Sequence, residues 1–518
     1  MRSINNSAAI ILARKGGCLD QVNDKLKAML FFAFALFAIR LSYGPFSGLA
    51  LFYDEAYYHF WSTELDWGYY SKPPLVAWLI YGTTHLFHSQ AEWAVRLASP
   101  VLYFASAYLI FASTRFLYNR LTGLYAAAIF YTTPLVSFNS LFITTDAPLL
   151  FCWSLAIYCY LHAAKSNSWW AWLGLGLAVG LGFLAKYTML VWLVGFIILT
   201  IWQKPPLRRV ISGKALVAVI LCGAIIFPNL LWNWQHDFIS FQHTAEISKL
   251  DQILFHPSQL LEFIAGQFLV FGPLSFYLLM LLFWRPLLTN KAEKLLLCLS
   301  LPLLFVMAVQ AILAKANMNW AAPAYVAASI MLARALVLGY KYKLLHIILV
   351  SNLTMGGIFY LYPQIQQLLN IEPTAKNTPF HRVEGWKPLF QSIPHYVEDA
   401  EHRVWLSDSR KLLSYLHYYL PQPYGQNLNV VSFNPDGKVE HQFDLHHTLN
   451  LSVGKDQSKQ KSAESDFIYL SEQPVELSGC FAVVHLTAHI KQTVYPSLQR
   501  ELYLYHVVGF QGYAHCKD

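Results

Sequence analysis

Long apolar stretches, separated by short polar segments, fill the chain up to about residue 362. Several run for about 18 or more residues almost without charge, which is long enough to cross a hydrocarbon core of roughly 30 Å. The shorter apolar segment 75–87 follows Pro73-Pro74 and is expected to lie at the membrane surface. We predict about eleven membrane-spanning helices, near residues 29–43, 94–114, 123–138, 147–164, 170–184, 188–202, 214–232, 260–283, 295–314, 320–338 and 344–362.

Beyond residue 362 the pattern changes to polar positions and short alternating segments. The segment 409–420 has helical spacing, and 452–465 is expected to be a flexible loop. We therefore expect residues 363–518 to form a small soluble α/β domain that follows the membrane region 29–362. Its predicted strands are 403–408, 430–434, 466–471, 480–486 and 501–510.

The composition also indicates a polytopic α-helical membrane protein. Of the 518 residues, 56% are hydrophobic and only 13% are charged, whereas a soluble protein carries roughly a quarter charged residues. Residues 1–28 resemble the basic start of a signal peptide, but the next apolar stretch lacks a clear cleavage site. We therefore expect a cytoplasmic segment 1–28 and an uncleaved first helix.

Lysines and arginines collect in the short segments between the predicted spans. With the N-terminus inside, 17 of them fall on the cytoplasmic side and 6 on the other side, up to residue 362. By the positive-inside rule, the loop 44–93 and the domain 363–518 should face outward, which is the periplasm in a bacterium. The net charge of +8 therefore does not indicate nucleic-acid binding, since no basic stripe with interleaved aromatics is present.

The outward-facing stretch 53–77, YDEAYYHFWSTELDWGYYSKPPLVA, combines four carboxylates with one lysine and many aromatics. A carboxylate in such a setting loses hydration, so its pKa rises toward the range that suits a general base. Asp54 and Glu55 therefore indicate a catalytic pair. The same residues also suit the start of a helix, with Asp54 as its cap and Glu55 favoured by the helix dipole. The residues alone leave both interpretations open.

Asp146, in FNSLFITTDAPLL (138–150), is a second carboxylate at a predicted outer span end. Thr145 or Asp146 could cap the helix that Pro148 helps to start, whereas its placement on the same side as Asp54 favours a functional partner. Few cations are expected near this outer face, and all are candidate contacts for a phosphate group, although Lys186 could equally snorkel at the interface. They are Arg40, Lys72, Arg96, Lys186 and Lys315.

Two further segments are candidates for substrate contact. NWQHDFISFQH (233–243) contains His243, but its spacing fits no zinc pattern and also suits an aromatic belt at the interface. KANMNWAAPAY (315–325) contributes Lys315, Asn319 and Trp320, or anchors a helix at the interface. In the outer domain, Cys480 and Cys516 could pair in an oxidising compartment.

DEAYYHFW followed by LDWGYYSKPPLVAWL resembles the first outer loop of bacterial GT-C glycosyltransferases. The relevant branch contains the dolichyl-phosphate-mannose-protein mannosyltransferase-like enzymes and the lipid A aminoarabinose transferases. The resemblance covers most of residues 29–430. The other segments that follow the family's order are TTDAPLL (144–150), GLGFLAKYTML (180–190), NWQHDFISFQH (233–243), NMNWAAPAY (317–325) and VWLSDSRKLLSYLHYYLPQP (404–423).

The resemblance implies a GT-C fold and inverting transfer of a sugar from a polyprenyl phosphate, without a nucleotide. Asp54 matches the family's catalytic acidic position, Glu55 completes the pair, and Asp146 matches a second acidic position. Lys72 matches the lysine of the K-P-P motif near the donor phosphate. Some relatives carry a metal-holding Glu directly before that lysine, where this chain has Ser71. We therefore predict no metal and no other cofactor.

The resulting hypothesis is that Asp54 activates an acceptor hydroxyl while Lys72, with Lys186 or Arg96, stabilises the departing polyprenyl phosphate. The acceptor is lipid A, another envelope glycan or a protein, and the donor tail lies in a lipid-facing groove of the inner membrane. The candidate substrate contacts are Tyr57, Tyr70, His243, Lys315, Asn319 and Trp320.

Three alternatives remain from the sequence. A transporter of lipid-linked sugars would also have many spans, but no inverted repeat is visible and the polar residues gather at one face rather than at mid-bilayer. An O-antigen ligase or polymerase would use a lipid-linked glycan. A scaffold would use its outer domain to recruit partners.

Overall fold

The computed structural model of the protein describes residues 27–204, 212–248, 255–284, 290–400, 402–420, 428–449 and 466–516. The chain divides into two compact units. The first, here the helical unit, comprises Met1–Phe46, Arg96–Leu230 and Ala245–Tyr360. The second, here the sheet unit, comprises Ser47–Val95, Leu231–Thr244 and Leu361–Asp518. The predicted loop 452–465 and nearly all of the predicted segment 1–28 lie outside the described residues.

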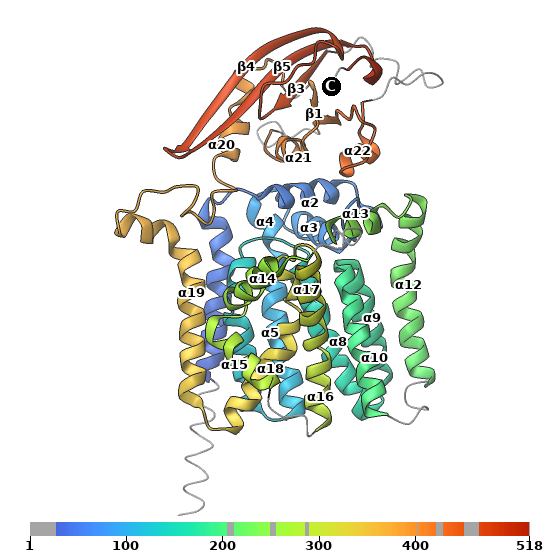
Figure 1. Ribbon diagram of the computed structural model, residues 1–518, viewed down its shortest axis with the longest axis vertical. Helices are drawn as coiled ribbons and strands as arrows, with labels where there is room; N and C mark the ends of the chain where they lie inside the picture. The colour runs from blue at the N-terminus through green and yellow to red at the C-terminus, as the bar shows by residue number, and fades with distance from the viewer. Residues whose placement is uncertain are drawn as a thin grey trace, which may run out of the picture. The chain divides into compact units, whose positions relative to one another are not determined.

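Helices account for most of the first unit, and each predicted span contains helical residues (Figure 1). The first described helix is Lys27–Ser47. The others, in chain order, are α5 (Ala98–Leu117), α6 (Arg120–Thr132), α7 (Pro134–Asn139), α8 (Asp146–Ser166), α9 (Trp169–Ala185), η1 (Tyr187–Met189), α10 (Leu190–Gln203), α12 (Gly213–Gln235), α14 (Pro257–Val270), α15 (Pro273–Phe283), α16 (Lys291–Cys298), α17 (Leu301–Leu313), η2 (Met318–Ala321), α18 (Ala324–Leu338) and α19 (Tyr342–Leu368). Two short helices, α4 (Glu92–Arg96) and α13 (Ile239–Ser248), belong mainly to the sheet unit.

Six of the described helices are long and apolar enough to cross a membrane, or seven if α14 and α15 count as one bent span. The predicted span 260–283 is therefore not one straight helix, because these two helices meet at an angle of 115°. Gly272 forms the break with a φ of 95°, and Pro273 begins the next helix. A Cβ at Gly272 would lie 2.1 Å from Asn352 Oδ1, so the bend requires glycine at this position.

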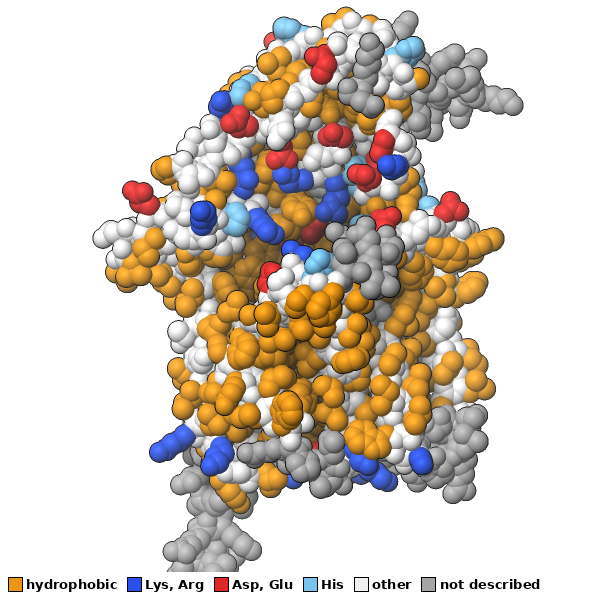
Figure 2. Space-filling view, in the orientation of Figure 1, with side chains coloured by type: hydrophobic (Ala, Val, Ile, Leu, Met, Phe, Trp, Pro, Cys, Tyr) orange, Lys and Arg blue, Asp and Glu red, His pale blue; other side chains and the backbone are white. Residues whose placement is uncertain are grey.

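The outside of the helical unit is apolar. Figure 2 shows hydrophobic side chains over this unit, with Lys and Arg side chains gathered at one end. Among the exposed large apolar residues are Ile197 and Ile201 of α10 and Leu216, Val219 and Phe227 of α12. A surface this apolar is unfavourable in water over so large an area, which is the physical reason that the unit belongs in a lipid bilayer.

The sheet unit contains a five-stranded sheet in the order β2-β1-β3-β5-β4. β1 pairs in parallel with β2 and β3, whereas β5 pairs antiparallel with β3 and β4. The predicted strands are all present, although β4 is longer than predicted because it forms a long hairpin with β5 (Figure 1). The strands are β1 (Val404–Ser407), β2 (Asn429–Ser432), β3 (Asp466–Ser471), β4 (Phe481–Tyr495) and β5 (Leu498–Phe510).

The core of this sheet is aromatic and is closed by a disulfide. Phe433, Phe467 and Phe510 belong to one buried cluster that also includes Cys480. Cys480 is bonded to Cys516, with their Cα atoms 4.5 Å apart, so the pairing that the sequence left open is confirmed.

The predicted outer loop packs against the C-terminal part of the same unit. It contains α2 (Tyr53–Thr63) and the expected short apolar helix α3 (Leu75–Leu86), and α21 (Arg410–Tyr419) lies against α2. The Tyr419 hydroxyl accepts a hydrogen bond from the Leu51 N–H at 2.7 Å, and the Tyr418 hydroxyl donates to the Gln90 carbonyl at 2.6 Å. These bonds attach α21 to residues that lie before and after the acidic stretch 53–77 in the chain. The remaining short helices are α20 (Trp386–Gln391), η3 (Ile393–His395), α22 (Gln442–His446) and η5 (Tyr513–His515).

Candidate active site

The start of α2 separates the roles of its two carboxylates. The helix begins at Tyr53, and the Glu55 carboxylate reaches back to accept the Phe52 N–H at 2.9 Å. Glu55 thus satisfies an N–H group that the helix itself leaves without a partner. The alternative in which Asp54 caps the helix is wrong, because Phe52 is the N-cap residue and Asp54 lies within the first turn. A part for Glu55 in catalysis stays a prediction.

Asp54 instead faces Arg410, the first residue of α21. The Arg410 Nη2 atom lies 3.2 Å from Asp54 Oδ1, and the two side chains are 30% and 35% exposed, respectively. The guanidinium also lies over two aromatic rings, 5.4 Å from the Tyr53 centroid and 5.0 Å from the Tyr57 centroid. These contacts fix the plane of the guanidinium beside the carboxylate.

The electrostatic environment suits Asp54 as a proton acceptor. Loss of hydration raises the pKa of Asp54, while the positive charges of Arg410 and then Lys72 oppose that rise. Lys72 is therefore close enough to act on the carboxyl group. A carboxylate with a raised pKa is a better proton acceptor than an ordinary aspartate.

Predicted substrate contacts lie in the same neighbourhood. The His243 ring is 4.7 Å from the Tyr70 ring, and burial, followed by the charges of Lys72 and Arg410, lowers the pKa of His243 to about 4. His243 is consequently neutral at physiological pH. The sheet unit thus brings together Asp54, Lys72, Tyr70 and His243.

Tyr57 has a supporting position. Its side chain is fully buried, and its hydroxyl accepts a hydrogen bond from the Gln442 N–H at 2.5 Å. Gln442 Oε1 in turn accepts the Tyr70 N–H at 2.7 Å. The buried Tyr57 ring therefore packs against the Arg410 guanidinium and holds it in place. Direct substrate contact by Tyr57 stays a prediction.

Sequence reasoning did not identify Arg410, which lies 356 residues from its partner Asp54. Arg410 lies beyond residue 362, outside the membrane region whose cations were predicted near the outer face. The available signal was the segment 404–423, which contains Arg410 and shares the family's order of motifs.

A second polar cluster lies within the helical unit. Asp146 Oδ1 is 2.8 Å from Lys186 Nζ, and Asp146 Oδ2 accepts from Asn319 Nδ2 at 2.6 Å. The Asp146 and Lys186 side chains are only 3% and 16% exposed. Each residue stands at an element boundary: Asp146 begins α8, Lys186 follows α9, and Asn319 lies in η2. Three separately predicted residues are thus joined, although their direct pairing was not foreseen.

The other predicted cations of the helical unit have separate positions. Arg96 ends α4, is buried, and lies 5.3 Å from the Phe142 ring centroid. Arg40 is buried and donates at 2.9 Å to the Tyr131 carbonyl and to Ser137 Oγ, which ties neighbouring helices together. Lys315 is exposed, and the partly buried Trp320 directly follows Asn319.

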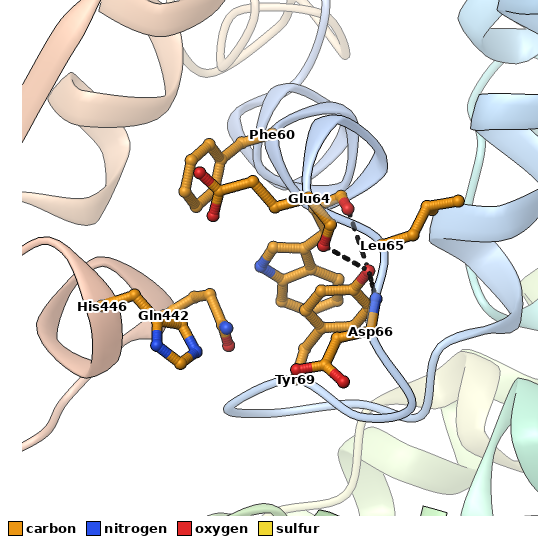
Figure 3. A pocket seen from close by; sticks show the side chains of 8 residues that line it. Phe60, Glu64, Leu65, Asp66, Tyr69, Gln442 and His446 are labelled. Atoms are coloured by element: carbon orange, nitrogen blue, oxygen red, sulfur yellow. Dashed lines mark hydrogen bonds between the residues drawn. The ribbon is translucent and has the colours of Figure 1, made fainter.

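The sheet unit also contains a cavity of about 280 Å³ at the far end of α2 from Asp54 (Figure 3). One side is held in shape by the Tyr69 hydroxyl, which donates toward the Trp61 and Glu64 carbonyls and accepts the Asp66 N–H. Ten residues separate Asp54 from Glu64, which corresponds to about 15 Å along a helix. The lining residues are Phe60, Trp61, Glu64, Leu65, Asp66, Tyr69, Gln442 and His446.

The position before Lys72 offers little to a metal ion. Ser71 is 5% exposed and stands where some relatives of the resembled family carry Glu. Within the described ranges, no group of three or more His, Cys, Asp or Glu side chains could hold a metal ion. Metal independence stays a prediction.

Comparison with known proteins agrees with this architecture. Residues 71–232 match the family model described as dolichyl-phosphate-mannose-protein mannosyltransferase. The chain is 36% identical over 316 residues to lipid A galacturonosyltransferase RgtD of Rhizobium johnstonii, an alignment that covers 60% of this chain and 65% of the relative. It is 27% identical over 197 residues to undecaprenyl phosphate-alpha-4-amino-4-deoxy-L-arabinose arabinosyl transferase 2 of Proteus mirabilis, over 36% of this chain and 35% of that protein.

Among solved structures, ArnT from Cupriavidus metallidurans in the apo state matches with a TM-score of 0.60 and 14% identity, over 93% of this chain and 98% of that chain. The same protein bound to undecaprenyl phosphate matches with a TM-score of 0.60 and 13% identity, over 93% and 97%. Identities this low support the fold alone.

Together, the fold and the family match make the chain similar to one class of proteins, the membrane glycosyltransferases of GT-C type. Within that class, the chain is similar to bacterial enzymes that are named for sugar transfer to lipid A or from undecaprenyl phosphate. The chain aligns with just under two thirds of the galacturonosyltransferase and about a third of the arabinosyl transferase.

Proposed function

We propose that the protein transfers a sugar from a polyprenyl phosphate to lipid A or another lipopolysaccharide acceptor at the periplasmic face of the inner membrane. The observation that carries the proposal is the Asp54 carboxyl group, held beside Arg410 and within the electrostatic reach of Lys72. The names of the galacturonosyltransferase and arabinosyl transferase relatives support a lipid-linked donor and a lipid A acceptor.

In the proposed reaction, Asp54 removes the proton from an acceptor hydroxyl. The acceptor oxygen then forms a bond to sugar C1, while the bond between C1 and the phosphate oxygen breaks on the opposite face. The configuration at C1 inverts, the proton stays on Asp54, and polyprenyl phosphate leaves with the bonding electron pair. Lys72 stabilises the negative charge on that phosphate.

The Asp146–Lys186–Asn319 cluster has a supporting role in this proposal. Asp146 lies 2.8 Å from the Lys186 Nζ atom and supplies its counter-charge. Asn319 fixes the other carboxylate oxygen. Contact of Lys186 or Arg96 with the donor phosphate stays a prediction.

For the sugar itself we propose a uronic acid. The name of the 36%-identical relative specifies a galacturonosyl transfer. A galacturonosyl phosphate lipid carries two negative groups, the sugar carboxylate and the phosphate, and the Asp54 neighbourhood contains two cations.

The test is transfer in vesicles that contain the purified protein, lipid A acceptor and polyprenyl-phosphate galacturonic acid. We expect Asp54→Asn to lower the rate by about 10²- to 10⁴-fold, as loss of a general base does, and Lys72→Ala by about 10²- to 10³-fold. Asp436→Asn, at a half-exposed loop residue, is the matched control and should transfer normally. Full activity of Asp54→Asn would remove that residue as the base, and movement of intact donor across the vesicle would instead support a transporter.

A further inference from the structure

The Arg410 side chain is held by three neighbouring residues and is still partly exposed. It donates to Asp54 and lies over the rings of Tyr53 and Tyr57, yet its side chain keeps 30% of its surface exposed. A guanidinium has five N–H donors in one plane, which match the two oxygens of a carboxylate. A partly exposed guanidinium is thus suited to bind a ligand carboxylate.

Resting on the proposed function, we infer that Arg410 is the residue that recognises the sugar carboxylate of a uronosyl donor. The carboxylate accepts hydrogen bonds from the open part of the guanidinium while Asp54 retains the Nη2 contact. Arg410 is thus a specificity-determining residue, separate from the base Asp54 and from the phosphate contact Lys72.

The charges around Asp54 favour this assignment over a second phosphate contact. Lys72 and Arg410 both act on Asp54 and on His243, so the two cations share one neighbourhood. His243 adds no charge there, because its pKa is lowered to about 4. The Asp54 and Glu55 carboxylates lie in the same neighbourhood, but Glu55 is engaged by the Phe52 N–H. A donor with a sugar carboxylate as well as a phosphate gives both cations a partner, whereas a donor with a neutral hexose has only its phosphate. An amino sugar would bring a positive charge toward Arg410, which disfavours that class of donor.

The distances also fit a single sugar ring. Arg410 is 3.2 Å from the Asp54 carboxylate, so a group bound to Arg410 lies within a few ångströms of the base. The reacting C1 and the carboxylate of a hexuronic acid are carried by the same six-membered ring. A sugar placed with C1 next to an acceptor on Asp54 can therefore present its carboxylate to Arg410.

The position of Arg410 is also well defined. Tyr57, beneath it, is fully buried and fixed by the Gln442 N–H. Ser409 caps α21 and so sets the start of the helix from which Arg410 projects. A guanidinium fixed in this way loses little entropy when it binds a planar anion.

The experiment compares two donors that differ only at C6, polyprenyl-phosphate galacturonic acid and polyprenyl-phosphate galactose. The measured quantity is the ratio of kcat/KM for the uronosyl donor to that for the hexosyl donor. Arg410→Gln should lower this ratio by about 10- to 100-fold, the range expected for loss of a charged hydrogen bond. Arg410→Lys retains the positive charge but not the planar fork, and should lower the ratio less.

The matched control is Lys411→Gln, because Lys411 is the next residue and pairs with Glu472 at 2.6 Å. It should keep the wild-type ratio. Equal losses with both donors in Arg410→Gln would assign Arg410 to the phosphate or to Asp54 and overturn the inference, as would a wild-type ratio in Arg410→Lys. If the wild type transfers neither sugar, the proposed function fails; if it transfers both equally well, only the assignment of Arg410 fails.

Discussion

The pairing of Arg410 with Asp54 has a measurable consequence for the pH dependence of transfer. Burial raises the pKa of Asp54, and the Arg410 charge opposes that rise. When Arg410→Gln removes the charge, the pKa of Asp54 should rise further. A smaller fraction of Asp54 is then ionised at each acidic pH, so the acidic limb of the rate profile should move to higher pH.

The size of this effect follows from the 3.2 Å contact. Coulomb's law gives about 1 kcal/mol for such a pair in bulk water and about 5 kcal/mol at an effective dielectric constant near 20. The side chains are 30% and 35% exposed, so solvent screening puts the effect at the lower end. Since a pH unit corresponds to about 1.4 kcal/mol, we expect the limb to move by about one pH unit.

The assay is the initial rate of transfer from saturating polyprenyl-phosphate galactose between about pH 4 and pH 9, the range that brackets the ordinary carboxyl and histidine pKa values. The neutral sugar removes any contribution of a substrate carboxylate. Lys411→Gln should leave the acidic limb in place, because Lys411 pairs with Glu472. An acidic limb that stays fixed or moves to lower pH in Arg410→Gln would refute Asp54 as the base that this arginine influences.

Three further predictions concern stability. Asp146→Asn should lower the free energy of unfolding by about 3 kcal/mol, because it leaves the buried Lys186 charge uncompensated. Adding Lys186→Met should restore most of that loss, and additive losses of the two substitutions in thermal-shift measurements would contradict the ion pair. Replacing Cys480 and Cys516 by serine opens a loop with a sequence separation of 36 and should lower the free energy of unfolding by about 3–4 kcal/mol. The sheet unit should then be cleaved faster by a protease, and an unchanged cleavage rate counts against the disulfide. His243 has a lowered pKa of about 4 in the folded protein, so it takes up a proton more readily when the protein is unfolded. The free energy of unfolding should therefore fall as the pH drops from about 6.5 toward 4. His243→Gln should weaken that fall in a pH series of thermal shifts.

Local patterns predicted the elements well because they depend on neighbouring residues. The alternating segments beyond residue 362 became strands, and the apolar stretches became helices. The span count was less well determined, since only six or seven described helices satisfy both length and composition. A hydropathy pattern does not show a bend such as that at Gly272, where a backbone conformation rather than polarity ends the helix.

Most residues of the candidate site were named from the sequence, but Arg410 and the contacts between the residues were not. Asp54 and Lys72 lie in one stretch, so their proximity follows from the chain itself. The contacts with Arg410 and between Asp146 and Lys186 join residues that are 356 and 40 positions apart, and only tertiary packing creates them. Glu55 is the opposite case, because its contact with the Phe52 N–H joins residues only three positions apart. The sequence predicted a helix start at this point but offered Asp54 as the cap.

The most direct test of the account is the mass spectrum of lipid A and of the lipid-linked donor from cells with the wild-type protein, with Asp54→Asn, or without the gene. We predict that only wild-type cells gain one sugar on lipid A or its core, with release of one free polyprenyl phosphate for each sugar transferred. Acceptors of identical mass in all three strains, or a sugar gained equally with Asp54→Asn, would contradict transfer by this site.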